Sequence, residues 1–279
     1  MKGCRVVDKI GFIGYGSMGS MLLNGFLSAG VLKAPEVVVA TRTVNRLNGL
    51  KDRWEVEIAD DNKKLVEQCK YVFICVKPIE VKEVLSEILQ HFRVDVHVIS
   101  IAASLTIENI ESIFKGKITK VIPSLTSDIG AGISLICHNS KVEHNDAKFI
   151  ENLFASISTV KRINEKDFEA GADLTSCAPG LIASIFQEFV EAGLRHSTLT
   201  REEAEEMVFE TLYGTAKLLR EKNMGFKEMI SRVATKGGIT EEGVQVLRSH
   251  LPSVFDELFY KTLAKHDKVK ELIDNQFKL

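Results

Sequence analysis

The chain has 279 residues, and 36 Lys and Arg against 38 Asp and Glu give it a formal net charge of −2. This balance gives no electrostatic reason to expect binding to nucleic acid or to an anionic membrane. With 45% hydrophobic and 27% charged residues, the composition excludes a disordered chain. At about 150 residues per domain, two domains are the first expectation.

Short apolar segments and scattered cysteines limit the class of protein further. The apolar run at residues 10–13 is interrupted by glycine and is too short for a signal peptide, and every other run falls short of the roughly 18 residues that span a bilayer. We therefore expect a cytoplasmic protein. The five cysteines are Cys4, Cys69, Cys75, Cys137 and Cys177. Their odd number and the lack of a C-x-x-C pair predict reduced, mostly buried thiols and no zinc site.

From residue 9 to about 163, short β-rich runs alternate with helical stretches. The expected strands are residues 10–13, 37–40, 71–76, 96–101, 118–122 and 133–137. Several of these runs are continuously apolar, which is typical of parallel strands covered on both faces. The pattern predicts a doubly wound α/β domain over residues 1–163.

After residue 163 the strand signals stop. Residues 164–279 are expected to form an all-helical domain with breaks at residues 198–200, 223–225, 236–238 and 250–252. The helix around residues 181–194 is apolar over most of its circumference, which is more than one buried face requires. Homodimerisation through these helices is our favoured interpretation, and burial within the helical domain is the alternative.

The strongest local motif is G-x-G-x-x-G between the first expected strand and the first expected helix. Its residues are Gly14, Tyr15, Gly16, Ser17, Met18 and Gly19. Gly14 permits a tight turn, Gly16 lets a pyrophosphate approach the backbone, and Gly19 lets the helix pack on the strand. The motif predicts a dinucleotide site, with a glycine-rich turn that binds nothing as the alternative.

The residues after the second strand bear on the choice of dinucleotide. An enzyme that uses NAD usually has Asp or Glu there to bond the ribose hydroxyls, whereas this chain has Thr41 and Arg42. The Arg42 guanidinium suits a 2′-phosphate, so we predict NADP rather than NAD, with a solvated Arg42 as the alternative. Lys77, after the strand at residues 71–76, should lie along the same crevice, although by position alone it is equally a surface lysine.

Six segments, in this order and spacing, resemble the pyrroline-5-carboxylate reductase family over essentially the whole chain. They are residues 10–19, 76–78, 99–103, the segment at Pro123, residues 178–179 and residues 237–240. The resemblance implies a Rossmann-like domain followed by an interlocked helical dimerisation domain. It also implies NADPH-dependent reduction of 1-pyrroline-5-carboxylate to proline.

The resemblance assigns roles to individual residues. The glycine motif would hold the pyrophosphate, and Thr41 and Arg42 the adenosine end. The nicotinamide would be bordered by Val76, Lys77, Pro78, Ala102 and Ala103. The substrate would lie near Gly237, Gly238, Ile239 and Thr240, and its other neighbours would be Ser176, Cys177 and Ala178 of the partner subunit. In this scheme the Thr240 hydroxyl orients the ring nitrogen, and the N–H groups after Gly237 bind the carboxylate.

Simpler interpretations exist for two of these residues. Thr240 precedes two glutamates and could be a helix N-cap, alone or together with the catalytic role. Cys177 has small, apolar neighbours in the sequence and no nearby histidine, which favours a buried thiol over a nucleophile. His138 and His144 lack ligand spacing, so no metal is assigned.

Three segments around the expected substrate position depart from the usual family pattern. They are residues 120–126, 175–181 and 235–240. The variant pattern is more similar to the late-competence-locus (ComER-like) branch of the family. That branch raises a second hypothesis, a catalytically silent NADPH-binding regulatory protein. The β-hydroxyacid dehydrogenases also combine a Rossmann-like domain with a helical domain, but they have a catalytic lysine in the long helix between the domains. Residues 167–216 of this chain contain no lysine, which disfavours that class.

Overall fold

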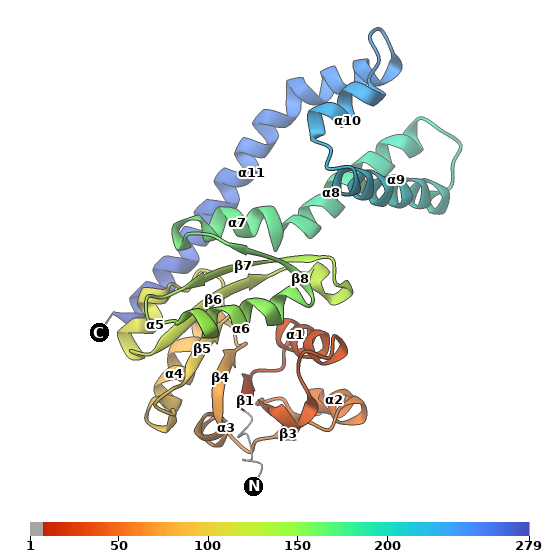
Figure 1. Cartoon of the computed structure of the whole chain (residues 1–279). Coiled ribbons are helices and arrows are strands. Elements are labelled where there is room, and N and C mark those ends of the chain that lie inside the picture. Colours follow the sequence, from red (N-terminus) through yellow and green to blue (C-terminus); the bar gives the residue numbers. More distant parts are fainter. Residues whose placement is uncertain (1–7, 279) are drawn as a thin grey trace. The chain divides into compact units, whose positions relative to one another are not determined.

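The computed structural model describes residues 8–278, which contain one mixed β-sheet flanked by helices, with further helices in the C-terminal part (Figure 1). The strands are β1 (Lys9–Ile13), β2 (Val37–Ala40), β3 (Glu57–Ile58), β4 (Cys69–Ile74), β5 (His97–Ser100), β6 (Lys117–Pro123), β7 (Gly132–His138) and β8 (Ser158–Arg162). Their order in the sheet is β3-β2-β1-β4-β5-β6-β7-β8. All neighbouring strands are parallel except β6 and β7, which are antiparallel.

The helices alternate with the strands and then continue alone. They are α1 (Ser17–Ser28), α2 (Asn48–Arg53), α3 (Asn62–Gln68), α4 (Val81–Ile88), α5 (Ile107–Ile113), α6 (His144–Ala155), α7 (Phe168–Thr175), α8 (Ala178–Arg195), α9 (Arg201–Glu221), α10 (Phe226–Val233) and α11 (Ile239–Phe277). The doubly wound sheet followed by an all-helical segment confirms the predicted fold class.

Both faces of the sheet are covered by helices, as the continuously apolar strands predict. Alternate strand residues point to opposite faces, so Phe12 and Phe73 join one core with α1 and α6, while Ile13 and Ile74 join the other with α3, α4 and α5. The end of α11 also packs on this second face through Ile273. A smaller core lies under α7, where Phe168 is fully buried.

Two of the strands are not among the six predicted from the sequence. β3 has two residues and lies at one edge of the sheet, and β8 lies at the other edge with the polar sequence STVKR. An edge strand that faces solvent does not need a continuous apolar run, so neither strand gives the signal that identifies the central strands.

The predicted helix breaks at residues 198–200, 223–225 and 236–238 are confirmed, because each lies between two helices. The predicted break at residues 250–252 is wrong, because α11 continues through Pro252. A proline removes one backbone hydrogen bond from a helix interior, and the 39-residue helix accommodates this loss.

The chain divides into two compact units whose limits differ from the predicted boundary at residue 163. Unit 1 holds the sheet together with residues up to 178 and residues from 263 onward, and unit 2 holds residues 179–262. The difference arises because α7 packs on β6 and β7, and the end of α11 packs on the sheet. In the described part of the chain, no helix combines the length and the apolar character that crossing a membrane requires.

Candidate functional site

Two glycines of the G-x-G-x-x-G motif allow close backbone contacts between β1 and its neighbours. Gly14 has a φ of +95°, and a Cβ built on it would lie 2.7 Å from the Cys75 carbonyl oxygen. A Cβ on Gly19 would lie 2.5 Å from the Gly14 carbonyl oxygen. A side chain on Gly14 would force the turn away from the end of β4, and one on Gly19 would force α1 away from the turn.

Gly16 has a different environment. A Cβ at this position would meet, among the described residues, only the Arg46 guanidinium at 3.7 Å. Gly16 is also the N-cap of α1, and no described side chain caps the first amides of that helix. Unsatisfied N–H groups and an open backbone surface at a helix N-terminus suit a phosphate group.

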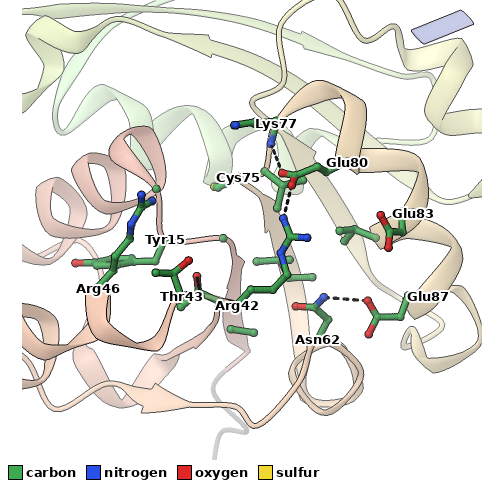
Figure 2. Close-up of a pocket in the computed structure, with 17 residues that line it drawn as sticks. Tyr15, Arg42, Thr43, Arg46, Asn62, Cys75, Lys77, Glu80, Glu83 and Glu87 are labelled. Atoms are coloured by element: carbon green, nitrogen blue, oxygen red, sulfur yellow. Dashed lines mark hydrogen bonds and ion pairs between the residues drawn. The ribbon is translucent and has the colours of Figure 1, made fainter. Parts of the chain in front are cut away.

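A cavity of about 330 Å³ lies beside this turn, at the carboxyl ends of β1, β2 and β4 (Figure 2). It is lined by Ile13, Gly14, Tyr15, Gly16, Ala40, Thr41, Arg42, Thr43, Arg46, Asn62, Cys75, Val76, Lys77, Glu80, Glu83, Val84 and Glu87. Open α/β sheets bind ligands in this position, beyond the carboxyl ends of their strands.

Charged residues of both signs line this cavity. The Arg42 guanidinium forms an ion pair with the Glu80 carboxylate, which lowers the pKa of that carboxyl group. The second carboxylate oxygen of Glu80 accepts a 3.1 Å hydrogen bond from the Lys77 backbone N–H. Glu87 accepts a 3.1 Å bond from the Asn62 amide on the facing helix (Figure 2).

Seven of the thirteen predicted cofactor residues line the cavity and six do not. The seven are Gly14, Tyr15, Gly16, Thr41, Arg42, Val76 and Lys77. The six are Ser17, Met18, Gly19, Pro78, Ala102 and Ala103. The first three of these begin α1, Pro78 follows Lys77 in the turn after β4, and the two alanines follow β5.

Sequence reasoning did not single out several residues of the cavity. Thr43 and Arg46 follow β2, and Glu80, Glu83 and Glu87 recur every three or four residues on and before α4. The spacing of these three glutamates indicates one face of a helix. The spacing does not show which way that face points. The sequence alone therefore could not place these glutamates at the cavity.

The first predicted substrate segment, Ser176, Cys177 and Ala178, lies in unit 1 at the end of α7 and the start of α8. The Cys177 N–H bonds the Ala172 carbonyl at 2.9 Å, which continues the turn of α7. The expectation that Cys177 is buried is wrong, because this residue is exposed in the described chain. Partial desolvation and the Asp173 carboxylate still raise the pKa of its thiol, which disfavours a nucleophilic thiolate.

The second predicted substrate segment, Gly237, Gly238, Ile239 and Thr240, lies in unit 2. Gly237 has a φ of +73°, and its N–H donates a 2.7 Å hydrogen bond to the Glu241 carboxylate. The helix begins at Ile239, so the interpretation of Thr240 as the N-cap is wrong: Thr240 is the second residue of α11. This hydrogen bond to the Glu241 carboxylate shows that the turn offers a backbone N–H group to an anion.

Comparison with known proteins identifies the relatives of this chain. Residues 9–104 match a family model described as NADP oxidoreductase, coenzyme F420-dependent, and residues 165–269 match one described as pyrroline-5-carboxylate reductase dimerisation. Pyrroline-5-carboxylate reductase 3 of Bacillus subtilis is 38% identical over 97% of this chain and 100% of its own length. The chain belongs to the pyrroline-5-carboxylate reductase family. It is therefore a member of an oxidoreductase family.

Other known proteins are similar to this chain over nearly its whole length. ComE operon protein 4 of B. subtilis is 28% identical over 96% of this chain and 99% of its own length. The solved reductase of Coxiella burnetii is 26% identical, with a TM-score of 0.83 over 96% of this chain and 98% of its own. That of Plasmodium falciparum, solved with NADP bound, is 23% identical, with a TM-score of 0.80 over 95% of this chain and 98% of its own.

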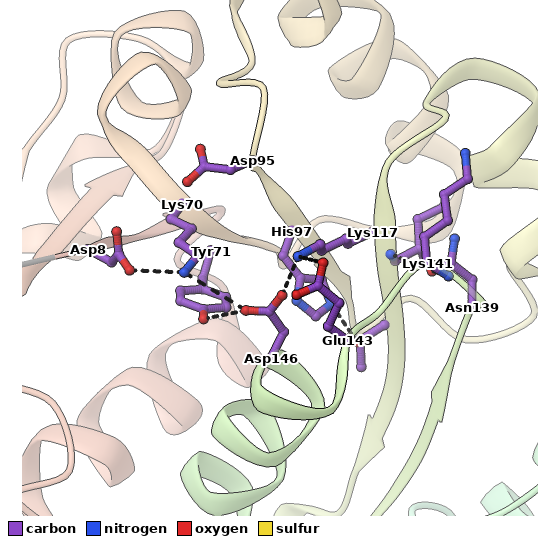
Figure 3. A network of polar contacts seen from close by, with 12 residues as sticks. Asp8, Lys70, Tyr71, Asp95, His97, Lys117, Asn139, Lys141, Glu143 and Asp146 are labelled. Carbon is purple, nitrogen blue, oxygen red and sulfur yellow. Dashed lines mark hydrogen bonds and ion pairs between the residues drawn. The ribbon is translucent and has the colours of Figure 1, made fainter.

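The chain also contains a cluster of polar side chains in its core. None of the residues in this cluster lines the cavity. Asp146 on α6 accepts a 2.8 Å hydrogen bond from the Tyr71 hydroxyl and forms a 2.5 Å ion pair with Lys117 (Figure 3). Nearby, the Thr119 hydroxyl lies 2.7 Å from one nitrogen of His97 and 2.7 Å from one nitrogen of His138. The cluster joins β4, β5, β6, β7 and α6, which indicates a role in stability.

Proposed function

We propose that this chain is an NADPH-dependent reductase that converts 1-pyrroline-5-carboxylate, or a related cyclic imine, to proline or the corresponding amine. The observation that carries the proposal is the glycine-lined cavity at the carboxyl ends of β1, β2 and β4, in a chain of the pyrroline-5-carboxylate reductase family. A bound dihydronicotinamide would supply the hydride for this reaction.

The residues of the cavity fit a phosphorylated dinucleotide. Gly16 and the uncapped amides of α1 would receive the pyrophosphate, because the backbone there is open and carries unsatisfied donors. Arg42 and Arg46, with the hydroxyls of Thr41 and Thr43, would receive the adenosine end. Two guanidinium groups and no aspartate or glutamate directly after β2 favour the 2′-phosphate of NADP over the free ribose hydroxyl of NAD.

The segments near the predicted substrate position would hold the imine without a strong general acid. A cyclic iminium already carries its proton, so the Thr240 hydroxyl needs only to orient the ring nitrogen. The Gly237 N–H, which bonds Glu241 in this structure, would exchange that carboxylate for the carboxylate of the substrate. In the proposed dimer, Ser176, Cys177 and Ala178 of the partner subunit would complete the surroundings of the ring.

A homodimer formed through the C-terminal helices is part of the proposal. Unit 2 leaves large apolar side chains exposed on its helices, including Phe189, Met207, Phe209, Tyr213, Phe226, Val246 and Tyr260. Large exposed apolar surfaces of this kind mark protein–protein contacts. The match to the dimerisation model of the family supports a second copy of this chain as the partner.

The test is the initial rate of NADPH oxidation with 1-pyrroline-5-carboxylate, measured beside NADH and a control without substrate. We expect a saturable rate that is higher with NADPH than with NADH. Tight NADPH binding without turnover on any cyclic imino acid would contradict the proposal.

A matched pair of variants checks the role of Thr240 in the same assay. Thr240→Val removes the hydroxyl at nearly constant volume and should lower kcat, whereas Thr240→Ser should keep most of it. The loss in kcat should be about 10- to 100-fold, since one hydrogen bond aligned in the transition state is worth about 1.5–3 kcal/mol. Equal rates for the two variants would contradict the assigned role.

A further inference from the structure

Three side chains with different metal-binding atoms meet in unit 1, outside the cavity described above. Asp173 and Cys177 lie four residues apart on α7 and its following turn, so they share one face. His266, on the last part of α11, lies against them. Its Nε2 is 3.4 Å from Asp173 Oδ1, and the ligand atoms of all three residues lie within 4.8 Å of one another.

These distances are close to those of a tetrahedral metal site. Zinc binds sulfur at about 2.3 Å and nitrogen or oxygen at about 2.0–2.2 Å, which places neighbouring ligand atoms roughly 3.3–3.7 Å apart. The His266–Asp173 separation of 3.4 Å already has this value. The widest separation, at most 4.8 Å, has to close by about 1 Å, which a side-chain rotation at the exposed Cys177 can supply.

A fourth residue orients the histidine. The Ser104 hydroxyl lies 3.3 Å from His266 Nδ1, the ring nitrogen that faces away from Asp173. A hydroxyl that accepts the Nδ1 proton leaves Nε2 with its lone pair toward Asp173 and Cys177, as metal-ligating histidines require. Ser104 is 3% exposed and has a φ of +59°, a conformation that non-glycine residues seldom adopt.

We propose that Asp173, Cys177 and His266 bind Zn²⁺ or a similar thiophilic divalent transition metal, with Ser104 as the outer partner of His266. Thiolate, imidazole and carboxylate together are the ligand set that zinc prefers, and three protein ligands leave a fourth position open to water. This proposal departs from the sequence prediction of no metal. The ligands come from two segments far apart in the chain, so no local spacing pattern reveals them.

Cobalt(II) titration of the reduced, full-length protein tests this site directly, without cofactor or imine. We expect one equivalent of Co²⁺ to produce tetrahedral d–d absorption and a thiolate-to-cobalt charge-transfer band, and Zn²⁺ to displace both. Cys177→Ser should abolish the charge-transfer band, and His266→Gln should weaken Zn²⁺ binding more than about 100-fold. Ser104→Ala removes the hydroxyl that contacts His266 Nδ1 and should weaken Zn²⁺ binding about 10-fold.

Two matched variants control for general effects of losing a thiol or an imidazole. Cys137→Ser changes a half-buried cysteine whose thiol lies near Glu165, and His91→Gln changes a histidine paired with Glu67. Both should bind Co²⁺ and Zn²⁺ like the unmodified chain. Wild-type-like melting of metal-free Cys177→Ser would show that the variant is folded.

Either of two results would overturn the proposal. One is a titration with no charge-transfer band, and the other is a band that survives Cys177→Ser. In that case the three residues form only a hydrogen-bonded cluster. The readout is binding, so its outcome is independent of whether the chain reduces an imine.

Discussion

The Arg42 guanidinium is paired with the Glu80 carboxylate, and both residues line the same cavity. Arg42 follows β2, whereas Glu80 ends the short turn between β4 and α4. The residue predicted to select NADP is therefore already bound to an internal anion. In the proposed complex, a 2′-phosphate would have to compete with Glu80 for Arg42, so the affinity for NADPH should depend on both residues.

Arg42→Ala should weaken NADPH binding about 10- to 100-fold, because charge-assisted hydrogen bonds to one phosphate are worth about 1.5–3 kcal/mol. NADH carries no 2′-phosphate, and its dissociation constant should change less than about three-fold. Fluorescence titration with the two nucleotides measures both constants. An equal loss for NADPH and NADH would show that Arg42 does not contact the 2′-phosphate.

Glu80→Gln should strengthen NADPH binding, because the variant releases Arg42 and removes one negative charge from the cavity. The side-chain amide oxygen of the variant can still accept the Lys77 backbone N–H, so the turn is preserved. Glu83→Gln is the matched control, since it removes the same charge from the same cavity at a residue other than the ion-pair partner of Arg42. If both variants raise the affinity equally, the effect is general electrostatics and the ion pair is not the cause.

Gly16→Ala should separate nucleotide binding from folding. The added methyl would meet only Arg46, at 3.7 Å, among the described residues, so the melting temperature should stay within about 2 °C. The methyl would occupy the surface predicted to receive the pyrophosphate, and NADPH binding should fall at least about 10-fold. Gly49→Ala, whose added methyl would meet nothing within 4 Å among the described residues, should leave NADPH binding unchanged and should not lower the melting temperature, because alanine suits α2 better than glycine. Unchanged NADPH affinity in Gly16→Ala would remove the pyrophosphate from this turn.

His97 should make the stability of the protein depend on pH. Burial lowers its pKa to about 4 from the ordinary 6.5, so between these values the unfolded chain binds a proton that the folded chain does not. The free energy of unfolding therefore falls by up to ~3 kcal/mol as the pH drops from about 6.5 to about 4, with no further loss from this residue below that pH. Urea unfolding at pH 7 and pH 4.5 measures this loss.

His97→Gln removes the titrating group while keeping a polar side chain near Thr119. The loss of stability between pH 7 and pH 4.5 should be smaller in this variant than in the unmodified chain. His91→Gln changes a surface histidine that is paired with Glu67. This variant should lose as much stability between pH 7 and pH 4.5 as the unmodified chain. A loss of the same size in all three proteins would assign the pH dependence to other groups.

Phe189→Glu tests the proposed dimer. Phe189 is 65% exposed and lines an apolar groove between α8 and α9 with Met207. A charge in this groove should shift the protein from dimer to monomer in sedimentation-velocity experiments, because a buried unpaired carboxylate is costly at an interface. Val94→Glu, at an exposed apolar residue of unit 1, should leave the oligomeric state unchanged. A dimer that persists in Phe189→Glu would place the interface elsewhere.

The central strands were predictable from the sequence because most of their residues are buried on both faces of the sheet, which gives each strand a short run of apolar residues. Val37–Ala40 is buried at every residue, and the same is true of His97–Ser100. The edge strands lack this constraint, which explains why Ser158–Arg162 gave no signal. Pro252 misled the prediction because a proline inside a helix removes one backbone hydrogen bond without always ending the helix, and α11 continues through it.

For the candidate site, the sequence revealed residues whose role depends on the backbone. The glycine motif was predictable because a turn with a φ of +95° and a 2.7 Å approach to a carbonyl oxygen accepts no side chain. Glu80 was not predictable because its side chain meets Arg42 only in the folded chain, and Arg46 was not because only the fold brings it to the cavity. Asp173 and His266 were missed for the same reason: the two segments that carry them meet only in the folded chain.

The reversed direction of β7 decides where α7 ends. Because β7 and β8 run opposite to the first six strands, the chain leaves β8 at the edge remote from the nucleotide cavity. α7 then returns across β6 and β7, and the Thr175 carbonyl accepts a hydrogen bond from Ser124, just past the carboxyl end of β6. With a parallel β7, the same helix would start at the cavity edge and carry Cys177 away from it. A single strand inversion thus delivers the residues after α7 to the edge where the nucleotide is expected.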